Sequence, residues 1–390
     1  MSIPTITPES GEGLPGLYVH IPFCRSKCGY CAFTSSPCAV PPADYLAAVT
    51  NEAERMAASP WSQARQFATL FIGGGTPTIY EAEELAGLLR VLRSLFAFVA
   101  QPEITVEANP NTVTQAKLAA LRDAGVNRLS LGVQSFSDRL LTAIGRSHSR
   151  AEAIAAIQAA RAAGFANLNL DLIYGLPGQS LADLRESLGV ALEHDGPEHL
   201  ALYELMVEPG TPLARWVEEG QFTLPDDDAM AEMEAMAQEA LARAGYQRYE
   251  IANDAKPGYA CRHNLNYWKN GSYLGLGAAA VSCLSGLRLK NVADPAHYAS
   301  LIAKGELPYA EAEALGLQAR YRETVIMGLR LLDGVSLPEL SARFGLTLAE
   351  VYGTTVERLV ERGLLVVAGD FMRLSNAALP VAHQVLADLV

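Results

Sequence analysis

The chain has 390 residues, of which 50% are hydrophobic and 19% are charged, and its formal net charge is −13. This length suits two domains, or one large barrel with an appended module, and the composition is that of a globular protein. A strongly acidic chain repels phosphate backbones, and no basic patch is present, so nucleic acid is not an expected partner. We expect no integral membrane segment, because Arg90 and Arg93 interrupt the longest apolar candidate, Leu85 to Ala100.

The first segment, residues 1–16, is rich in Pro, Gly, Ser and Thr and predicts a disordered leader. It lacks the basic and apolar regions of a secretory signal, so we expect a cytoplasmic protein. Disulfides rarely persist in that compartment. The scattered residues Cys38, Cys261 and Cys283 therefore fit free thiols.

Residues 17–244 alternate between short apolar runs and longer stretches with helical spacing. The expected strands are Leu17–Ile21, Ala68–Ile72, Glu103–Glu107, Arg128–Gly132, Asn167–Leu172 and His199–Leu205. The expected helices are Asp44–Met56, Glu81–Phe98, Thr112–Ala124, Arg150–Ala163 and Ala182–Glu193. Repeated strand–helix units predict an α/β fold with a parallel sheet, either doubly wound or an incomplete barrel. In both, the functional site forms where the strands meet the loops that follow them.

The loop after the first strand carries Cys24, Cys28 and Cys31 in a Cys-x3-Cys-x2-Cys spacing. Three thiolates can hold three corners of an iron–sulfur cube and leave the fourth iron without a protein ligand. A structural zinc site would need a fourth Cys or His, and His20 is the nearest. A disulfide with a spare thiol conflicts with the expected compartment. The spacing therefore favours an iron–sulfur cluster with an open corner.

The other strand ends carry glycines and polar side chains. The run Gly73 to Gly75 permits close backbone approach and leaves amides for a ligand, although a tight turn would also explain it. Glu107, Gln134 and Asp171 end or follow the next three strands. Each is either a solvated polar residue or a site residue. Their convergence at one edge of the sheet favours the second interpretation.

After residue 244 the alternation stops. The segment Lys256–Trp268 is dense in polar and aromatic residues, with His263 close to Tyr267. Taken alone, it is either a ligand loop or a packing loop. We favour packing, because a histidine beside aromatic residues is usually structural.

The last part, residues 309–390, predicts helices followed by a hairpin. Its expected features are a helix at Arg320–Leu332, capping boxes at Ser336–Glu339 and Thr347–Glu350, and a hairpin of Leu364–Val367 and Phe371–Leu374. This order is winged-helix-like, which suggests DNA binding. However, the helix that begins at the second capping box is expected to carry Glu350, Glu357 and Glu361 against Arg358 and Arg362, so it is not a basic recognition helix. We therefore interpret the module as structural or as binding a protein.

These motifs together resemble a known family. The cysteine motif, Gly-Gly-Gly-Thr-Pro at 73–77 and Asp-Leu-Ile-Tyr-Gly-Leu-Pro-Gly-Gln at 171–179 are similar to the radical S-adenosylmethionine (SAM) superfamily, and most closely to its oxygen-independent coproporphyrinogen III oxidase branch. The segment His-Asn-Leu-Asn-Tyr-Trp at 263–268 looks like the signature of the heme chaperone (HemW) group of that branch. The resemblance implies an incomplete (β/α)6 radical SAM barrel at 17–253, a connecting segment at 254–308 and a C-terminal, mostly α, winged-helix-like module at 309–390.

The resemblance also implies roles for matching residues. Cys24, Cys28 and Cys31 would ligate a 4Fe–4S cluster whose open iron takes the amine and carboxylate of SAM. The positions that match SAM-contacting residues are Tyr18, Tyr30, Gly74, Gly75, Thr76, Glu107, Gln134, Arg146, Asp171 and Leu205. Carboxylates complement the sulfonium and ammonium of SAM, and an arginine suits its carboxylate. His263 is a candidate axial ligand for heme.

Departures from the oxidase pattern select between subgroups. The oxidase usually has a fourth cysteine two residues beyond the third, where this chain has Phe33, and an N-terminal extension where this chain has 17 residues before Tyr18. Both favour a heme chaperone that delivers heme to a target protein. Against this, Ala279-Ala280-Val281 replaces the Gly-Ala-His often found in chaperones, so a heme ligand expected there is missing. The alternatives are coproporphyrinogen III oxidase, or a radical SAM enzyme with another substrate, and a homodimer is left open.

Overall fold

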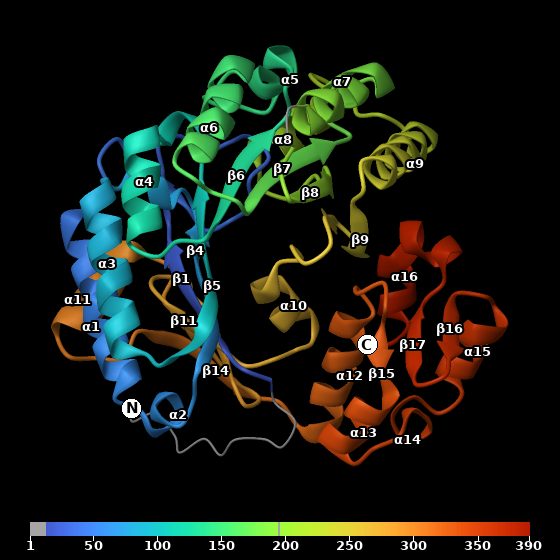
Figure 1. Cartoon of the computed structure of the whole chain (residues 1–390). Coiled ribbons are helices and arrows are strands. Elements are labelled where there is room, and N and C mark those ends of the chain that lie inside the picture. Colours follow the sequence, from blue (N-terminus) through green and yellow to red (C-terminus); the bar gives the residue numbers. More distant parts are fainter. Residues whose placement is uncertain (1–12, 194–195) are drawn as a thin grey trace.

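The computed structural model of the chain describes residues 13–193 and 196–390. Most of the expected leader, residues 1–12, lies outside the described residues. Its last residue, Gly16, already belongs to the first strand, β1. The chain forms one large curved sheet with helices outside it, and a smaller C-terminal unit beside it (Figure 1).

The large sheet has twelve strands in the order β14-β13-β12-β11-β1-β4-β5-β6-β7-β8-β10-β9. Seven adjacent strands are parallel: β11 (Tyr273–Leu276), β1 (Gly16–Ile21), β4 (Phe67–Gly74), β5 (Phe98–Ala108), β6 (Arg128–Gln134), β7 (Leu168–Tyr174) and β8 (His199–Glu204). From β1 to β8 their order in the sheet follows the chain without reversal. A doubly wound sheet would reverse its direction, so the sheet is the wall of an incomplete barrel, as expected.

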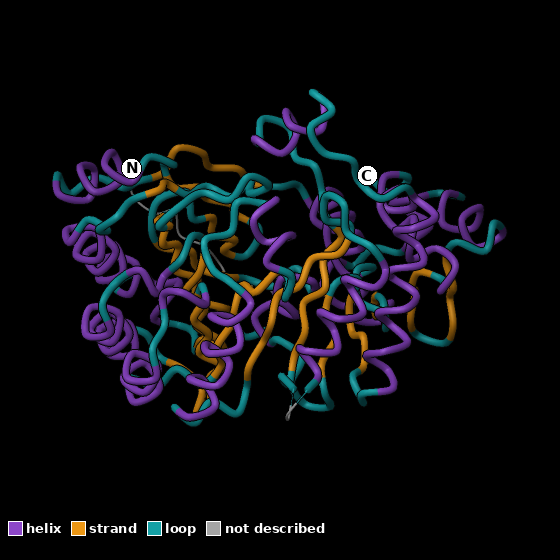
Figure 2. Tube along the Cα trace, turned by 90° about the horizontal axis from the view of Figure 1, so that it is seen from above, coloured by secondary structure: helices purple, strands orange, loops and turns teal. Residues whose placement is uncertain are grey.

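Crossover helices cover the outer face of this wall. They are α1 (Ala43–Ala57), α3 (Ala82–Leu95), α4 (Gln115–Asp123), α6 (Arg150–Ala162) and α7 (Leu181–Leu192). Figure 2, seen from above, shows helices around the outside of the strands. Along β1, Leu17, Val19 and Ile21 are fully buried in the core against these helices. Because side chains alternate along a strand, Tyr18 and His20 face the inside of the barrel.

Several boundaries differ from the sequence prediction. The helix expected at Arg320–Leu332 is Leu317–Gly328. The largest difference lies between α3 and β5. The helix expected at Glu81–Phe98 ends at Leu95, and β5 begins at Phe98 rather than Glu103. The cause is pairing with a distant segment, since Phe98 lies opposite Phe67 of β4. The seventh parallel strand, β11, was not expected at all, because four residues in a glycine-containing segment give little periodic signal.

Antiparallel strands extend both ends of the parallel region. At one end are β10 (Asn253–Ala255) and β9 (Gln247–Glu250), and at the other β12 (Val281–Leu284), β13 (Leu287–Asn291) and β14 (Tyr309–Ala314). The remaining elements of this part are β2 (Phe23–Cys24), β3 (Ser36–Pro37), α2 (Pro60–Gln63), η1 (Pro77–Ile79), η2 (Pro110–Thr112), α5 (Asp138–Ala143), α8 (Pro212–Glu218), α9 (Asp227–Arg243), α10 (Arg262–Trp268) and α11 (Pro295–Ala303).

The C-terminal unit has a hydrophobic core of its own. Its elements are α12 (Leu317–Gly328), β15 (Val335–Ser336), α13 (Leu337–Phe344), α14 (Leu348–Tyr352), α15 (Thr355–Glu361), β16 (Leu365–Ala368), β17 (Phe371–Leu374), η3 (Asn376–Val381) and α16 (Ala382–Ala387). The predicted hairpin is present as β16 and β17, and β15 joins it in a three-stranded sheet. The capping box of Thr347 and Glu350 is closed in both directions. At Ser336 the prediction was wrong in part: its side chain caps α13, but the return bond from Glu339 is not formed.

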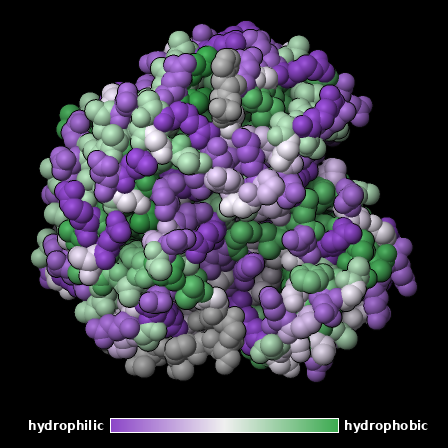
Figure 3. All heavy atoms as spheres, viewed as in Figure 1, coloured by the Kyte–Doolittle hydropathy of each residue, from purple (hydrophilic) through white to green (hydrophobic). Residues whose placement is uncertain are grey.

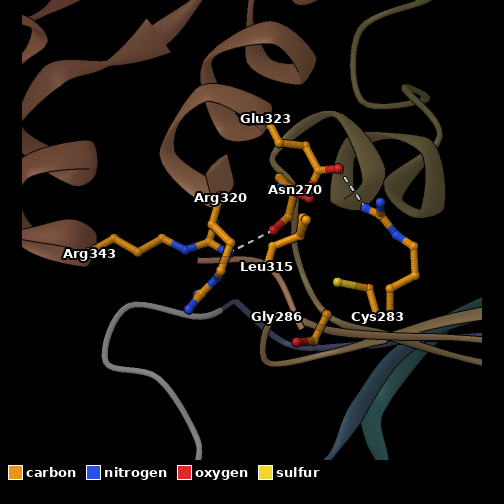
Figure 4. A pocket seen from close by; sticks show the side chains of 9 residues that line it. Asn270, Cys283, Gly286, Leu315, Arg320, Glu323 and Arg343 are labelled. Carbon is orange, nitrogen blue, oxygen red and sulfur yellow. Dashed lines mark hydrogen bonds and ion pairs between the residues drawn. The ribbon is translucent and has the colours of Figure 1, made fainter. Parts of the chain in front are cut away.

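The C-terminal unit is fastened to the large sheet by polar contacts. Arg288 forms an ion pair with Glu323 at 2.6 Å. Arg343 donates a hydrogen bond to the carbonyl oxygen of Asn270 at 2.9 Å, and Figure 4 shows Arg343, Asn270 and Glu323 close together. These residues line a small pocket between the two units. On the face that Figure 3 shows, hydrophilic and hydrophobic residues are mixed in small patches. A notch separates α9 from the C-terminal unit. Among the described residues, no helix has the length and apolar character needed to cross a membrane.

Candidate functional site

A cavity with about 710 Å³ of empty space lies at the carboxyl ends of the parallel strands. Its walls come from the cysteine loop after β1 and from the ends of β4, β5, β6 and β7. The lining residues are Cys24, Ser26, Lys27, Cys28, Tyr30, Cys31, Phe33, Ser35, Gly74, Gly75, Thr76, Glu107, Ala108, Asn109, Ser130, Gly132, Gln134, Arg146 and Asp171. The convergence of strand-end loops that the sequence suggested is therefore present.

All three motif cysteines line this cavity as free thiols. Cys28 is buried, and Cys24 and Cys31 are half-buried. Cys38, whose amide bonds to the carbonyl oxygen of Cys24 at 2.8 Å, is not part of the lining. Three thiols on one loop, facing one cavity, fit an iron–sulfur cube with one corner left for another ligand.

The cysteine loop is held from two sides at Gly29. Its amide donates to the carbonyl oxygen of Ile144 at 2.9 Å, and its carbonyl oxygen accepts from the amide of Leu213, at the start of α8, at 2.8 Å. A Cβ atom at Gly29 would lie 2.5 Å from the Trp216 ring of α8. Only glycine therefore allows this close approach of α8 to the loop.

A chain of side-chain hydrogen bonds connects two of the sulfur atoms. The Thr76 hydroxyl donates to Cys24 Sγ at 3.4 Å and accepts from Asn109 Nδ2 at 3.1 Å. Asn109 Oδ1 accepts from Arg146, which also bonds to the carbonyl oxygen of Gly132 and, through Nη1, to Cys28 Sγ at 3.4 Å. Hydrogen bonds to the sulfurs and a nearby cation are two of the means by which proteins tune such clusters.

Burial raises the pKa of the Cys24 and Cys31 thiols above the usual value. The thiolate is the form that binds metals. The positive charge of iron would reverse this effect, as bound cations do for coordinating thiols. Among the described residues, no three His, Cys, Asp or Glu side chains are grouped to hold a single metal ion. A cube held by three cysteines does not require such a group, since three of its irons take one protein sulfur each and the fourth takes none.

Two carboxylates, Glu107 of β5 and Asp171 of β7, lie on the opposite wall. Glu107 Oε2 accepts from the amide of Gly74 at 3.0 Å, and Gly74 has a φ of 108°, which suits glycine alone. Burial, followed by the charge of Asp171, raises the pKa of Glu107 to about 7. Burial also raises the pKa of Asp171 to about 6. Both groups would gain from a cationic ligand, which stabilises their charged form.

Gln134 lines the same cavity from the end of β6. Its φ of 67° is left-handed, and the pairing register of β6 with β7 shifts between Gly132 and Gln134. Such a shift re-aims side chains at a strand end. Asn109 and Ser130 also line the cavity, and sequence reasoning did not select them. Their position in the sequence could have identified them, since Asn109 lies two residues after Glu107 and Ser130 lies two residues before the predicted strand end at Gly132.

Three predicted site residues lie away from the cavity lining. Leu205 is packed in a small apolar cluster behind Tyr30, which does line the cavity. Tyr18 is deeper in the barrel, where its hydroxyl bonds to His20 Nδ1 at 2.8 Å. His263 is deeper still, beside Thr69. Their proposed roles in SAM or heme binding stay predictions.

His263 is fully enclosed, with 1% of its surface exposed. One ring nitrogen, Nδ1, bonds to the Thr69 hydroxyl at 2.7 Å, and Nε2 bonds to the Tyr267 hydroxyl at 3.0 Å. Burial lowers the pKa of the imidazole to about 3. Glu103 accepts from the amides of Arg262 and His263, both at 3.1 Å, and so caps α10. This geometry matches the packing role, since heme ligation by His263 would require breaking one of these bonds.

Comparison with known proteins identifies the family. Residues 18–191 match the radical SAM superfamily, and residues 315–381 match the HemN C-terminal domain. The heme chaperone HemW of Mycobacterium tuberculosis is 38% identical over 394 residues, which cover 100% of this chain and 98% of the relative. The chain belongs to the HemW family of heme chaperones. The expected resemblance is thereby confirmed.

Other HemW proteins give the same result. The HemW of Bacillus subtilis is 38% identical over an alignment that covers 89% of this chain and 92% of that protein. The HemW of Escherichia coli is 42% identical over 68% of both chains. Among solved structures, the coproporphyrinogen III oxidase HemN of Escherichia coli superimposes with a TM-score of 0.83, over 98% of this chain and 91% of that one, at 23% identity. That likeness shows the fold alone.

Proposed function

We propose that this protein is a heme chaperone that holds a 4Fe–4S cluster and SAM in the strand-end cavity, binds heme and delivers it to a target protein. The observation that carries the proposal is the gathering of three free cysteines, two half-buried carboxylates and an arginine around one cavity in a HemW chain. Each class of group matches one part of the cofactors: sulfur for iron, carboxylate for cation, guanidinium for carboxylate.

The chain's own residues have distinct tasks in this proposal. Cys24, Cys28 and Cys31 would hold the cluster, which when bound supplies an iron open to the amino-acid end of SAM. Glu107 and Asp171 would face its positive groups. Arg146 keeps two of its donors engaged with protein oxygens and Cys28, so it would hold the cysteine loop against β6 whether or not SAM is present.

Phe33 favours the chaperone function over porphyrinogen oxidation. This residue stands where the oxidase usually has a fourth cysteine, and its side chain is 71% exposed at the cavity mouth. A large exposed apolar side chain at the entrance to a site suits contact with an apolar cargo or partner. We assign no heme ligand, because both ring nitrogens of His263 have partners.

A cytoplasmic location is part of the proposal, supported by the six cysteines, all of which are free. The number of copies in the working assembly is open to measurement, since a homodimer would elute earlier in gel filtration.

Heme retention tests the proposal. Anaerobically reconstituted protein is mixed with heme and passed through a gel-filtration column, and the protein peak is expected to carry a Soret band. A peak without heme would contradict the chaperone function. In parallel, the protein is incubated with dithionite, SAM and coproporphyrinogen III. Formation of protoporphyrinogen would establish the oxidase instead. The Cys24→Ala variant should lose the cluster absorbance near about 400 nm, which excludes a colourless zinc site.

A further inference from the structure

Asp171 is oriented by a chain of buried side chains that leads away from the cavity. Asn169, two residues earlier on β7, donates from Nδ2 to Asp171 Oδ1 at 2.7 Å. The same Nδ2 also donates to the Ser130 hydroxyl at 2.7 Å. Asn169 Oδ1 bonds to His199 Nδ1 of β8 at 2.5 Å, and His199 Nε2 bonds to the Tyr249 hydroxyl of β9 at 2.9 Å. Four strands or loops therefore contribute to fixing one carboxylate.

The chemistry of the groups fixes which atom donates in each of these hydrogen bonds. A charged carboxylate only accepts, so the amide nitrogen of Asn169 must face Asp171 and its oxygen must face His199. The imidazole must then carry its proton on Nδ1 to donate to that oxygen. Its Nε2 is left as an acceptor for the Tyr249 hydroxyl. His199 is fully buried, and burial lowers its pKa well below the usual value, so this neutral tautomer is the stable one.

Tyr249, the last residue in this series of hydrogen bonds, is itself held by two backbone contacts. The Tyr249 hydroxyl accepts from the amide of Cys261, just before α10, at 3.3 Å. The Tyr249 carbonyl oxygen accepts from the amide of Leu332, beyond α12, at 3.1 Å. Tyr249 is therefore held by both the connecting segment and the C-terminal unit. Its position cannot shift without disturbing a neighbour on each side.

We propose that His199 and Tyr249 are positioning residues for the SAM site, which hold Asp171 in one orientation through Asn169. With Oδ1 taken by Asn169, Oδ2 is the oxygen left to meet a ligand. A carboxylate that is already oriented loses less entropy when it binds. The inference rests on the proposed function, because it requires that SAM binds in the cavity that Asp171 lines.

Removal of the Tyr249 hydroxyl tests the inference. Anaerobically reconstituted wild type and Tyr249→Phe are titrated with SAM by calorimetry. We expect the variant to bind about 3- to 10-fold more weakly, the effect of one buried hydrogen bond. The matched control is Tyr246→Phe, just before β9. Its buried hydroxyl bonds to the carbonyl oxygen of Pro197 and has no link to Asp171, so SAM affinity should be unchanged.

A double-mutant cycle separates positioning from a general loss of structure. Asp171→Asn is measured alone and combined with Tyr249→Phe. If Tyr249 acts through Asp171, the tyrosine substitution should have little further effect once the carboxylate is gone. Fully additive losses would overturn the inference. His199→Gln interrupts the same series of hydrogen bonds at another residue and should weaken SAM binding in a similar way. The test therefore remains possible if the Tyr249→Phe protein folds poorly.

A spectroscopic readout completes the experiment. The electron paramagnetic resonance signal of the reduced cluster is followed while SAM is added. In Tyr249→Phe the final spectrum should match that of wild type but require more SAM. Wild type that shows no SAM binding would contradict the proposed function itself. Wild type that binds SAM, with Tyr249→Phe equal to it, would overturn only the positioning role.

Discussion

Burial disfavours the charged forms of Glu107 and Asp171 at the candidate ligand site. Both carboxylates are half-buried, and they are close enough for the charge of Asp171 to raise the pKa of Glu107. Burial raises the pKa of Asp171 by more than the hydrogen bond from Asn169 and the charges of Arg128 and Arg146 lower it. A cationic ligand would supply the charge that the protein itself does not fully provide. The burial that disfavours the two charges thus makes a cationic ligand more favourable.

The pH dependence of stability and of binding should therefore run in opposite directions. The pKa values of Glu107 and Asp171 are raised to about 7 and about 6, so the folded state binds their protons more tightly than the unfolded state. This contribution to stability is complete below the unfolded pKa values near about 4 and is lost as the pH rises through the folded ones. The free energy of unfolding of ligand-free protein should fall between about pH 4 and about pH 7, by on the order of 1 kcal/mol for each unit of pKa shift.

SAM affinity, measured by calorimetry over the same range, should increase with pH as the two carboxylates ionise. Glu52, buried in α1 with its pKa raised to about 7 by burial, changes stability with the same sign but lies outside the cavity. The Glu107→Gln variant separates the two, since it should flatten the binding profile and leave the Glu52 contribution. A SAM affinity that is equal at both ends of the range would contradict the prediction.

Gly29 is the point at which the cysteine loop packs against α8. Because a Cβ atom there would lie 2.5 Å from the Trp216 ring, Gly29→Ala should push α8 away from the loop. We expect iron and sulfide content after anaerobic reconstitution to fall at least about 2-fold, with a loss of stability of about 1–3 kcal/mol, as for overpacked cores. The control is Gly87→Ala on α3, where a Cβ atom meets nothing within 4 Å.

Gly87→Ala should leave the cluster content unchanged and stabilise the helix by up to about 1 kcal/mol. Thermal unfolding of both variants, followed by circular dichroism, gives the second measurement. Full cluster content in Gly29→Ala would show that α8 does not support the loop.

The elements that the sequence predicted are those with a local signal. Strands β1 and β4 to β8 have apolar runs, and the motif loops follow them, so both the barrel and the cavity wall could be anticipated. The early start of β5 at Phe98 could not, because it depends on pairing with Phe67, 31 positions away in the chain. The link from Tyr249 to Asp171 was invisible for the same reason. It joins four segments through contacts that no periodicity records.

At the scale of the whole molecule, charge decides what the winged-helix-like unit can bind. The exposed face of α15 carries Glu357, Arg358 and Glu361, and Arg362 follows it. The full chain has a net charge of −13. Affinity for DNA comes largely from cations that displace counterions from phosphates. A helix with balanced charges on an acidic protein lacks that contribution.

We therefore expect no binding of the full chain to duplex DNA in fluorescence anisotropy at about 50 mM salt, a concentration that favours even weak electrostatic association. The double variant Glu357→Lys, Glu361→Lys gives α15 a basic exposed face, and it should bind weakly and lose that binding steeply as salt rises. This variant shows that the assay would detect an electrostatic complex. Salt-dependent binding by wild type would contradict the prediction and would require a basic surface elsewhere on the chain. Absence of binding leaves the exposed face of the unit available for a protein, which fits delivery of heme to a target.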